Sequence, residues 1–234
     1  MRPLDEIAID LLREHEPPEG YWLAFSGGKD SVVIKHLADR AGVKYRAFYN
    51  VTTIDPPEII YFMRKHHADV EWKRPKQPFL KRMLYMGFPT RIARWCCREY
   101  KELFRPDGLM LTGIRMEESA KRKSRRTIEA AINGPTTFVH PILSWASDEL
   151  WNYIRAENLA HCSLYNNGWR RIGCLFCPNA TPSERQMHGQ QYPRHEQAFR
   201  KAFRSLHAKR TAQENSSVSR WSNGDEMFDW WIRG

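Results

Sequence analysis

Apolar residues along the chain are grouped at two different spacings. Leucine and isoleucine recur three or four positions apart over residues 4–13, which predicts an amphipathic helix. Short runs rich in apolar and aromatic residues occur instead at residues 21–25, 44–49, 69–72, 108–113 and 138–142. Runs of this length, bounded by glycine, proline and polar residues, are typical of strands. The chain is therefore expected to alternate between helices and strands.

Further helices are predicted between these strands. They cover residues 32–40, a segment that starts at residues 55–58, residues 95–104, and a segment from Ser147. Strands that alternate with helices predict an α/β fold, in which a twisted parallel sheet carries helices on both faces. Ligands bind such sheets beyond the carboxyl ends of the strands. We therefore expect the functional residues to follow strands directly.

Composition sets the size and class of the protein. With 234 residues and 41% hydrophobic content, the chain can bury the core of one α/β domain, expected over residues 1–180 and including the cysteines. Residues 181–234 are expected to form a helical, basic extension packed on it. No apolar run is long enough for a membrane span or a signal peptide, so a cytoplasmic protein without a membrane partner is expected. The net charge of +10 favours a polyanionic partner.

The segment Ser26-Gly27-Gly28-Lys29-Asp30-Ser31 lies between the first strand and the next helix. Two glycines allow a tight turn with exposed backbone N–H groups, and the helix N-terminus adds a positive dipole end. Lysine and serine side chains supply further donors to phosphate. A carboxylate beside phosphate indicates bound Mg²⁺. The alternative is an ordinary turn with incidental glycines.

The spacing SGGKDS differs from the Walker A pattern and resembles the pyrophosphatase loop, or PP-loop, of the adenine nucleotide alpha hydrolase superfamily. This resemblance implies that ATP binds with Mg²⁺ and that chemistry occurs at the α-phosphate with release of pyrophosphate. The expected catalytic residues are Lys29, Asp30 and Arg115. The expected nucleotide-binding residues are Ser26, Gly27, Gly28, Lys29, Asp30, Ser31, Asn50, Gly113 and Arg115.

The cysteines form a second group of interest. Five cysteines without a recognisable export signal favour metal or redox chemistry over disulfides. Cys96 and Cys97 are adjacent, and Cys174 and Cys177 form a CxxC turn. Four sulfur ligands suit zinc or an iron–sulfur cluster, although adjacent cysteines are unusual in zinc knuckles, and buried unliganded thiols are a third interpretation. Cys162 is interpreted as a packed thiol.

Several segments together resemble the phosphoadenosine phosphosulfate reductase family. The matching segments are residues 26–31, 94–97, 113–115, 118–119, 140–142, 173–174 and 177–178. In the iron–sulfur branch of that family, a vicinal cysteine pair and a CxxC turn hold a [4Fe–4S] cluster. The resemblance therefore implies that Cys96, Cys97, Cys174 and Cys177 are the cluster ligands.

Two departures from the reductase pattern change the expected activity. Reductases carry a Glu-Cys-Gly segment with the nucleophilic cysteine, whereas this sequence has no cysteine after Cys177. Residues 49–53 read Tyr-Asn-Val-Thr-Thr where reductases tend to carry Asp-Thr-Gly. The chain is more similar to the sulfur-transfer members, which include DNA phosphorothioation enzymes and iron–sulfur tRNA thiolases.

We therefore expect an ATP pyrophosphatase that activates a substrate at the adenylate α-phosphate for sulfur transfer. The partners implied are an adenine nucleotide, a nucleic-acid substrate, and a cysteine desulfurase or another sulfur donor. Two alternatives stay open: a sulfonucleotide reductase, and a noncatalytic nucleotide-binding subunit of a DNA modification complex.

Two basic segments fit a nucleic-acid partner. Residues 115–126 are expected to form a loop over the site, and residues 192–210 a helix with interleaved basic and aromatic residues. Phe199, Phe203 and Leu206 also fit the spacing of a helix face that packs into a core. This helix therefore fits both a nucleic-acid-binding surface and a face that packs into a core. The terminal tryptophans are expected to dock a final helix.

Overall fold

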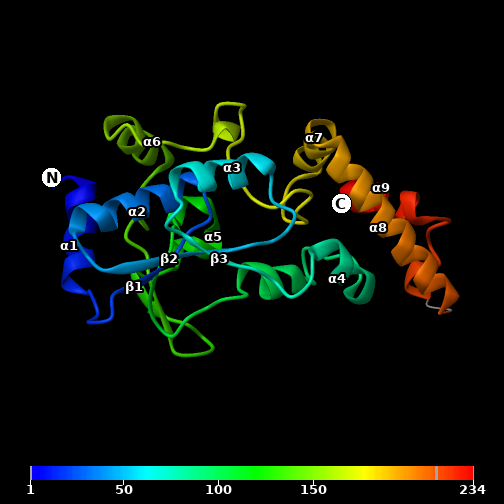
Figure 1. The fold of residues 1–234 in the computed structure, drawn as a ribbon, viewed down its shortest axis with the longest axis horizontal. Helices are drawn as coiled ribbons and strands as arrows, with labels where there is room; N and C mark the ends of the chain where they lie inside the picture. Colours follow the sequence, from blue (N-terminus) through cyan, green and yellow to red (C-terminus); the bar gives the residue numbers. More distant parts are fainter. Residues whose placement is uncertain (1, 214–215, 234) are drawn as a thin grey trace. The chain divides into compact units, whose positions relative to one another are not determined.

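The structure is a computed structural model that describes residues 2–213 and 216–233 (Figure 1). The chain divides into two compact units, each built from separate segments. The first unit comprises residues 1–50, 57–73 and 104–172, and the second comprises residues 51–56, 74–103 and 173–234. All four predicted cluster cysteines belong to the second unit, together with the C-terminal helices. The domain boundary expected at residue 180 stays a prediction.

A six-stranded sheet forms the centre of the first unit. Its strands are β1 (Tyr21–Ala24), β2 (Tyr45–Asn50), β3 (Glu71–Lys73), β4 (Gly108–Leu111), β5 (Ile128–Ala130) and β6 (Thr136–Val139), in the order β3-β2-β1-β4-β6-β5. All neighbouring strands are parallel except β5, which pairs antiparallel with β6. The expected α/β class with a mainly parallel sheet is confirmed. The edge strand β5 has only three residues, too few for a recognisable alternation.

Helices of the first unit connect and cover these strands. They are α1 (Leu4–Glu14), α2 (Lys29–Ala41), α3 (Pro57–His66), α5 (Ala120–Lys123) and α6 (Ser147–Ala156), with two 3₁₀ turns, η2 (Met116–Glu118) and η3 (Ser163–Tyr165). Val33, Ile34 and Leu37 on α2 are fully buried, as are Leu23 of β1 and Leu111 of β4. The apolar pattern of the sequence therefore becomes the core of this unit.

Two helices differ from expectation in an informative way. Helix α2 begins three residues earlier than expected, because Gly28 takes the N-cap position in an extended conformation and Lys29 is already helical. The segment 115–126 was expected as a loop but contains η2 and α5. An ion pair between Glu118 and Arg122, one helical turn apart, supports this local structure.

The strand order defines where a ligand can bind in the first unit. From β1 the chain proceeds to β2 and β3 on one side, whereas β4 lies on the other side of β1. At such a switch point the loops that follow the two adjacent strands diverge and leave a crevice. The loop after β1 contains residues 26–31, and the loop after β4 contains Gly113 and Arg115. The two predicted segments therefore border one crevice.

The second unit is mainly helical. It contains α4 (Phe79–Met86), a π-helical turn η1 (Cys97–Lys101), α7 (Pro182–Gln191), α8 (Pro193–Ala212), a 3₁₀ turn η4 (Ser216–Val218) and α9 (Gly224–Arg233). The helix expected over residues 95–104 is thus mostly a π-helical turn. Helices α8 and α9 lie side by side (Figure 1).

The packing of α8 decides between its two interpretations. Phe199, Phe203 and Leu206 are all at most 2% exposed, so the core-packing interpretation is confirmed for these residues. Arg200 and Arg204 of the same helix form ion pairs with Asp225 of α9. Part of the basic charge of α8 is therefore already balanced by α9.

Within residues 2–213 and 216–233, every helix is too short or too polar to cross a membrane.

Candidate functional site

The loop at residues 26–31 forms a compact turn at the start of α2. The Ser26 N–H donates to the Ser31 hydroxyl over 3.2 Å, and that hydroxyl donates to the Gly28 carbonyl over 2.8 Å. Gly27 has φ of +71°, and a Cβ placed there would lie 3.2 Å from Met63 of α3. Only glycine combines this backbone conformation with so close an approach. The geometry of the loop is thus set by its own residues.

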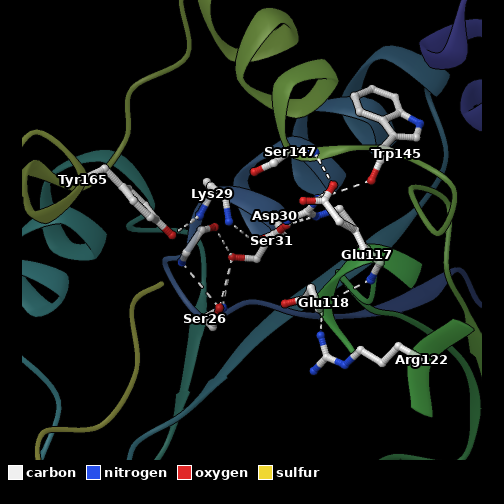
Figure 2. Close-up of polar contacts among 12 residues, drawn as sticks. Ser26, Lys29, Asp30, Ser31, Glu117, Glu118, Arg122, Trp145, Ser147 and Tyr165 are labelled. Carbon is white, nitrogen blue, oxygen red and sulfur yellow. Dashed lines mark hydrogen bonds and ion pairs between the residues drawn. The ribbon is translucent and has the colours of Figure 1, made fainter. Parts of the chain in front are cut away.

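Lys29 lies at the first position of α2. Its backbone N–H donates to the Tyr165 hydroxyl over 2.9 Å, and its ammonium group lies 3.1 Å from the Asp30 carboxylate (Figure 2). The Lys29 side chain is only 6% exposed. Its charge is therefore held inside the crevice and close to the loop.

Arg115 lies opposite Asp30 at the same crevice. Its Nε donates to Asp30 Oδ1 over 2.6 Å, and its Nη1 donates to the Trp145 carbonyl over 3.3 Å. The Arg115 side chain is 4% exposed and the Asp30 side chain 19%, so the ion pair is mostly shielded from water, and Glu117 lies 3.5 Å from Arg115 Nη1 as a second partner. Because Lys29 and Arg115 each contact one oxygen of Asp30, this carboxylate joins the two cations. Direct binding of Mg²⁺ by Asp30 stays a prediction.

Gly113 permits this close contact between the two loops. A Cβ at this position would lie 2.9 Å from the Cβ of Asp30 and 3.3 Å from its backbone carbon. A larger residue would therefore push the loop after β4 away from α2. The expected meeting of Gly113, Arg115 and the Ser26–Ser31 loop is confirmed in the geometry, whereas their contact with a nucleotide stays a prediction.

Asn50 follows the expected strand but has other partners. It is the last residue of β2, and its amide group both donates to the Phe104 carbonyl and accepts from the Phe104 N–H, each over 3.1 Å. These bonds tie β2 to the segment before β4. A nucleotide contact by Asn50 stays a prediction.

Several more arginines gather near the crevice. Burial lowers the pKa of Arg122, and the nearby charges of Arg171, Arg125 and Arg115 lower it further, whereas Asp30 acts in the opposite direction. Mutual repulsion of this kind requires that the guanidinium groups lie close together. Arg122 and Arg125 are also paired with Glu118 and Glu129, so part of this positive charge is balanced.

His140 joins the carboxyl ends of the sheet strands. The side chain is fully buried after β6, with Nδ1 2.6 Å from the Thr112 hydroxyl and Nε2 3.3 Å from Glu129. Burial lowers the pKa of His140, and Glu129 opposes that effect. The contacts of this residue fit a structural role between β4, β5 and β6.

The four predicted ligand cysteines line one pocket of the second unit. Cys96 and Cys97 come from the start of η1, and Cys174 and Cys177 from the CxxC turn. The pocket also includes Lys101, which follows Cys97 by one turn of η1. Among the described residues, no three His, Cys, Asp or Glu side chains are grouped as ligands of a single metal ion. The pocket thus gathers the four thiols without bringing them to one point.

The electrostatics of this pocket act in opposite directions on its thiols. A hydrogen bond with Cys96 lowers the pKa of Cys97 to about 6, and the same bond raises the pKa of Cys96. Burial raises the pKa of Cys174 to about 12, although Lys101 opposes this effect. The charge of Cys174 in turn raises the pKa of Lys101, against the effect of burial. The thiolate is therefore favoured at Cys97, where Lys101 also lowers the pKa.

Arg185 adds a second buried cation to this region. The residue is 2% exposed, and no partner is found for its Nε among the residues that the structure describes. Burial lowers the pKa of Arg185, as does Arg91, whereas Cys177 raises it. The donor set of this region, four soft sulfur atoms with two buried cations beside them, fits a thiolate-bound centre of net negative charge.

Cys162 has a different environment in the first unit. Its side chain is 0% exposed, and burial raises the pKa of its thiol. Both properties match the expectation of a packed thiol, because a nucleophilic cysteine needs access and a lowered pKa.

Sequence reasoning missed two residues at these sites. Tyr165 lies 136 positions from Lys29, so no local pattern connects them. The position of Lys101 beside Cys97 could have been predicted, because a residue four positions after Cys97 lies on the same face of a helical turn.

Fold and site together define an α/β protein with a mainly parallel sheet and a glycine-containing loop beside buried cations at the carboxyl ends of its strands. The chain belongs to the phosphoadenosine phosphosulfate reductase domain family, whose profile matches residues 20–180.

Relatives of known sequence include both uncharacterised proteins and reductases. The chain is 27% identical over 177 residues to the uncharacterised protein MJ0973 of Methanocaldococcus jannaschii, covering 69% of this chain and 42% of that protein. It is 29% identical over 174 residues to the adenosine 5'-phosphosulfate reductase of Allochromatium vinosum, covering 67% of each. The chain spans only about two fifths of the length of the two M. jannaschii relatives it matches.

Solved structures share the fold. The phosphoadenylyl-sulfate reductase of Candida auris, in a phosphate complex, aligns with a TM-score of 0.56 and 17% identity over 71% of this chain and 87% of that one. The FMN adenylyltransferase of Candida glabrata, with FAD and pyrophosphate, aligns with a TM-score of 0.55 and 13% identity over 73% and 64%. These identities support the fold alone.

Proposed function

We propose that this protein is an ATP pyrophosphatase that adenylates an acceptor and prepares it for sulfur transfer, with nucleic acid as the acceptor class. The observation that carries the proposal is the crevice at the switch point of the sheet. It combines the Gly27-Gly28 turn and the N-terminus of α2 with the buried cations Lys29 and Arg115. Donors and cations fixed in a desolvated crevice stabilise charge that develops on phosphate.

The proposed reaction has two steps. An oxygen of the acceptor attacks the α-phosphorus of ATP, the bond from that phosphorus to the bridging oxygen breaks, and pyrophosphate leaves. A sulfur nucleophile then displaces AMP from the adenylated acceptor. The Lys29 ammonium group and the N-terminal end of α2 hold the pyrophosphate, and Arg115 lies where it can stabilise the charge at the α-phosphate.

Asp30 has a positioning role in this proposal. Its two oxygens contact Lys29 and Arg115, so the carboxylate fixes both cations relative to one another. Mg²⁺ would arrive on the phosphates of ATP, and the chain's residues are assigned no step through it. A loop that is pre-ordered in this way loses little entropy when the nucleotide binds.

The cysteine pocket is proposed to hold a [4Fe–4S] cluster through Cys96, Cys97, Cys174 and Cys177. Each thiolate of such a cluster binds a different iron, so the four sulfurs need not converge on a single point. Lys101 and Arg185 would balance part of the negative charge of the thiolates. When bound, the cluster supplies one-electron and sulfur-binding chemistry.

The nucleic-acid and sulfur-donor partners rest on charge and on the family resemblance. The net charge is +10, and Arg122, Arg125 and Arg171 gather near the nucleotide crevice. A basic surface of this kind attracts the phosphate backbone without reading sequence. The sulfur donor is proposed to be a cysteine desulfurase or another sulfide-releasing protein.

Product analysis tests the proposal. Anaerobically prepared protein is incubated with ATP or with adenosine 5'-phosphosulfate plus thioredoxin, each with and without tRNA or DNA. We expect pyrophosphate and AMP from ATP, more of both with the correct nucleic acid, and none in Lys29→Ala. Sulfite formation from the sulfonucleotide, without pyrophosphate release from ATP, would contradict the proposal.

Sulfonucleotide reduction is the second candidate, because several relatives are named adenosine 5'-phosphosulfate reductases. That reaction needs a thiol that attacks the sulfate sulfur. Outside the four proposed ligands the sequence has only Cys162, which is buried and has a raised pKa. Sulfite formation that disappears in Cys162→Ser would establish this alternative.

A further inference from the structure

Tyr165 reaches the nucleotide crevice from a distant part of the first unit. Its hydroxyl accepts a hydrogen bond of 2.9 Å from the backbone N–H of Lys29, the first residue of α2. Figure 2 shows the ring pointing its oxygen toward Lys29 at the edge of the loop. A Cβ placed on Gly28 would lie 3.4 Å from this hydroxyl. The tyrosine is therefore in direct contact with the loop that is proposed to hold phosphate.

Neighbouring aromatic rings hold this side chain in place. The rings of Trp151 and Tyr165 meet edge to face, with centroids 5.2 Å apart, and His161 packs against both. Edge-to-face pairs of this kind have a preferred geometry and stabilise one orientation. The hydroxyl position is thus fixed by packing.

The Tyr165 hydroxyl has one unused hydrogen-bonding function. Its oxygen accepts from Lys29, while no acceptor for its proton is found in the described part of the chain. Burial raises the pKa of Tyr165, the Lys29 N–H opposes this, and Asp30 raises the pKa further. The hydroxyl is therefore protonated at neutral pH and can donate a hydrogen bond.

The charges around the hydroxyl favour an anionic acceptor for that proton. The Lys29 ammonium lies 5.6 Å from the centre of the Tyr165 ring, and Arg171 is close enough to affect the pKa of Tyr165. Asp30, the carboxylate that raises the pKa of Tyr165, is already bound by Lys29 and Arg115. A phosphate oxygen would find both a donor and positive charge at this point.

We propose that Tyr165 is a phosphate ligand of the nucleotide site and donates its hydroxyl proton to an oxygen of the pyrophosphate moiety. This inference rests on the proposed function, because it assumes that the loop binds the β- and γ-phosphates. The hydroxyl extends the cradle, since Lys29 N–H, Tyr165 and phosphate form one chain of hydrogen bonds. The residue belongs to binding and is assigned no bond-making step.

Calorimetric titration of Tyr165→Phe tests the inference. The probes are inorganic pyrophosphate, ATP and AMP, and the matched control is Tyr153→Phe, which removes a hydroxyl of the same unit that contacts His36 and Arg40. We expect Tyr165→Phe to weaken pyrophosphate and ATP binding by roughly tenfold, the effect of one lost hydrogen bond to a charged group. AMP binding in this variant, and all binding in Tyr153→Phe, should match the wild type.

A second measurement does not depend on the variant's folding. In wild-type protein with ¹³C-labelled tyrosine, pyrophosphate should shift the resonance of the Tyr165 ζ-carbon, whereas AMP should leave it in place. Unchanged pyrophosphate affinity in Tyr165→Phe would overturn the inference, as would tighter binding, which would mean that the hydroxyl competes with phosphate. An unmoved resonance at saturation would also overturn it. Wild-type protein that binds neither pyrophosphate nor ATP would instead overturn the proposed function, and the inference with it.

Discussion

Lys29, Asp30 and Arg115 form a charge arrangement that exists before any ligand binds. The carboxylate lies between the two cations, with contacts of 3.1 and 2.6 Å, and all three side chains are at most 19% exposed. These three groups together carry one net positive charge, and the half-exposed Glu117 lies 3.5 Å from Arg115. An incoming phosphate therefore meets cations that are already oriented, and the carboxylate limits their mutual repulsion.

The first residue-scale prediction concerns this carboxylate. Asp30→Asn removes the closer of the two carboxylates paired with buried Arg115 and also the partner of Lys29, so we expect the free energy of unfolding to fall by about 3 kcal/mol. Urea unfolding followed by circular dichroism measures the change. Asp10→Asn is the matched control, because it breaks an exposed pair with Arg2 and should cost less than about 1 kcal/mol. Equal losses in both variants would show that Asp30 does not hold the crevice together.

His67 provides a residue-scale prediction of pH dependence. The pKa of His67 is lowered to about 4, mainly by burial and also by the charge of Lys35, whereas Asp69 opposes the shift. Both ring nitrogens are buried without a partner in the described chain, between Phe25 and Phe62. Since the folded pKa lies below the unfolded value of 6.5, the unfolded state binds the proton first as pH falls. The stability contributed by neutral His67 is therefore complete above pH 6.5 and lost progressively toward pH 4.

Urea unfolding at pH 7 and pH 5 checks this prediction. The wild type should lose about 2 kcal/mol more than His67→Leu between these two pH values, from the size of the shift. His66→Leu is the matched control. His66 is next to His67 in sequence but exposed, so the unfolding free energy of this variant should keep the wild-type pH dependence. The same pH dependence in wild type and His67→Leu would refute the assignment.

At the scale of elements, sequence patterns predicted what depends on neighbouring residues. Helix α1 and strand β1 follow from their apolar spacing, and the Ser26–Ser31 loop follows from its glycines. The crevice between the loops after β1 and β4 follows from the rule for parallel sheets. These are properties of single elements or of the sheet class.

Elements without a local signal could not be predicted. Strand β5 has three residues, and η1 is π-helical, a conformation for which the sequence offers no distinctive period. The contact between Tyr165 and Lys29 depends on how η3 packs, which is a tertiary property. The ion pairs between acidic residues of α9 and basic side chains of α8 are likewise tertiary contacts. In these cases contacts between elements, and not the local sequence, determine the structure.

At the scale of the whole molecule, the two units separate the two proposed kinds of chemistry. The phosphate cradle is formed by residues of the first unit, and the four-cysteine pocket by residues of the second. Cys96 and Cys97 come from the segment 74–103, and Cys174 and Cys177 from the segment 173–234. A centre bound by all four thiolates would therefore crosslink two distant segments of the second unit. Such a crosslink stabilises the folded state of the segments it joins.

Iron content and hydrogen exchange together test this last point. Anaerobically prepared wild type should be brown and contain about four irons per chain, whereas Cys174→Ser should lose its colour and most of its iron. In that variant, amides of residues 91–103 and 173–180 should exchange faster, because the crosslink is gone, while amides of β1, β2 and β4 keep their protection. Cys162→Ser is the matched control, since this buried thiol lies in the first unit and should leave both iron and exchange unchanged. Stoichiometric zinc without iron, or full iron content in Cys174→Ser, would refute a cluster bound by these four cysteines.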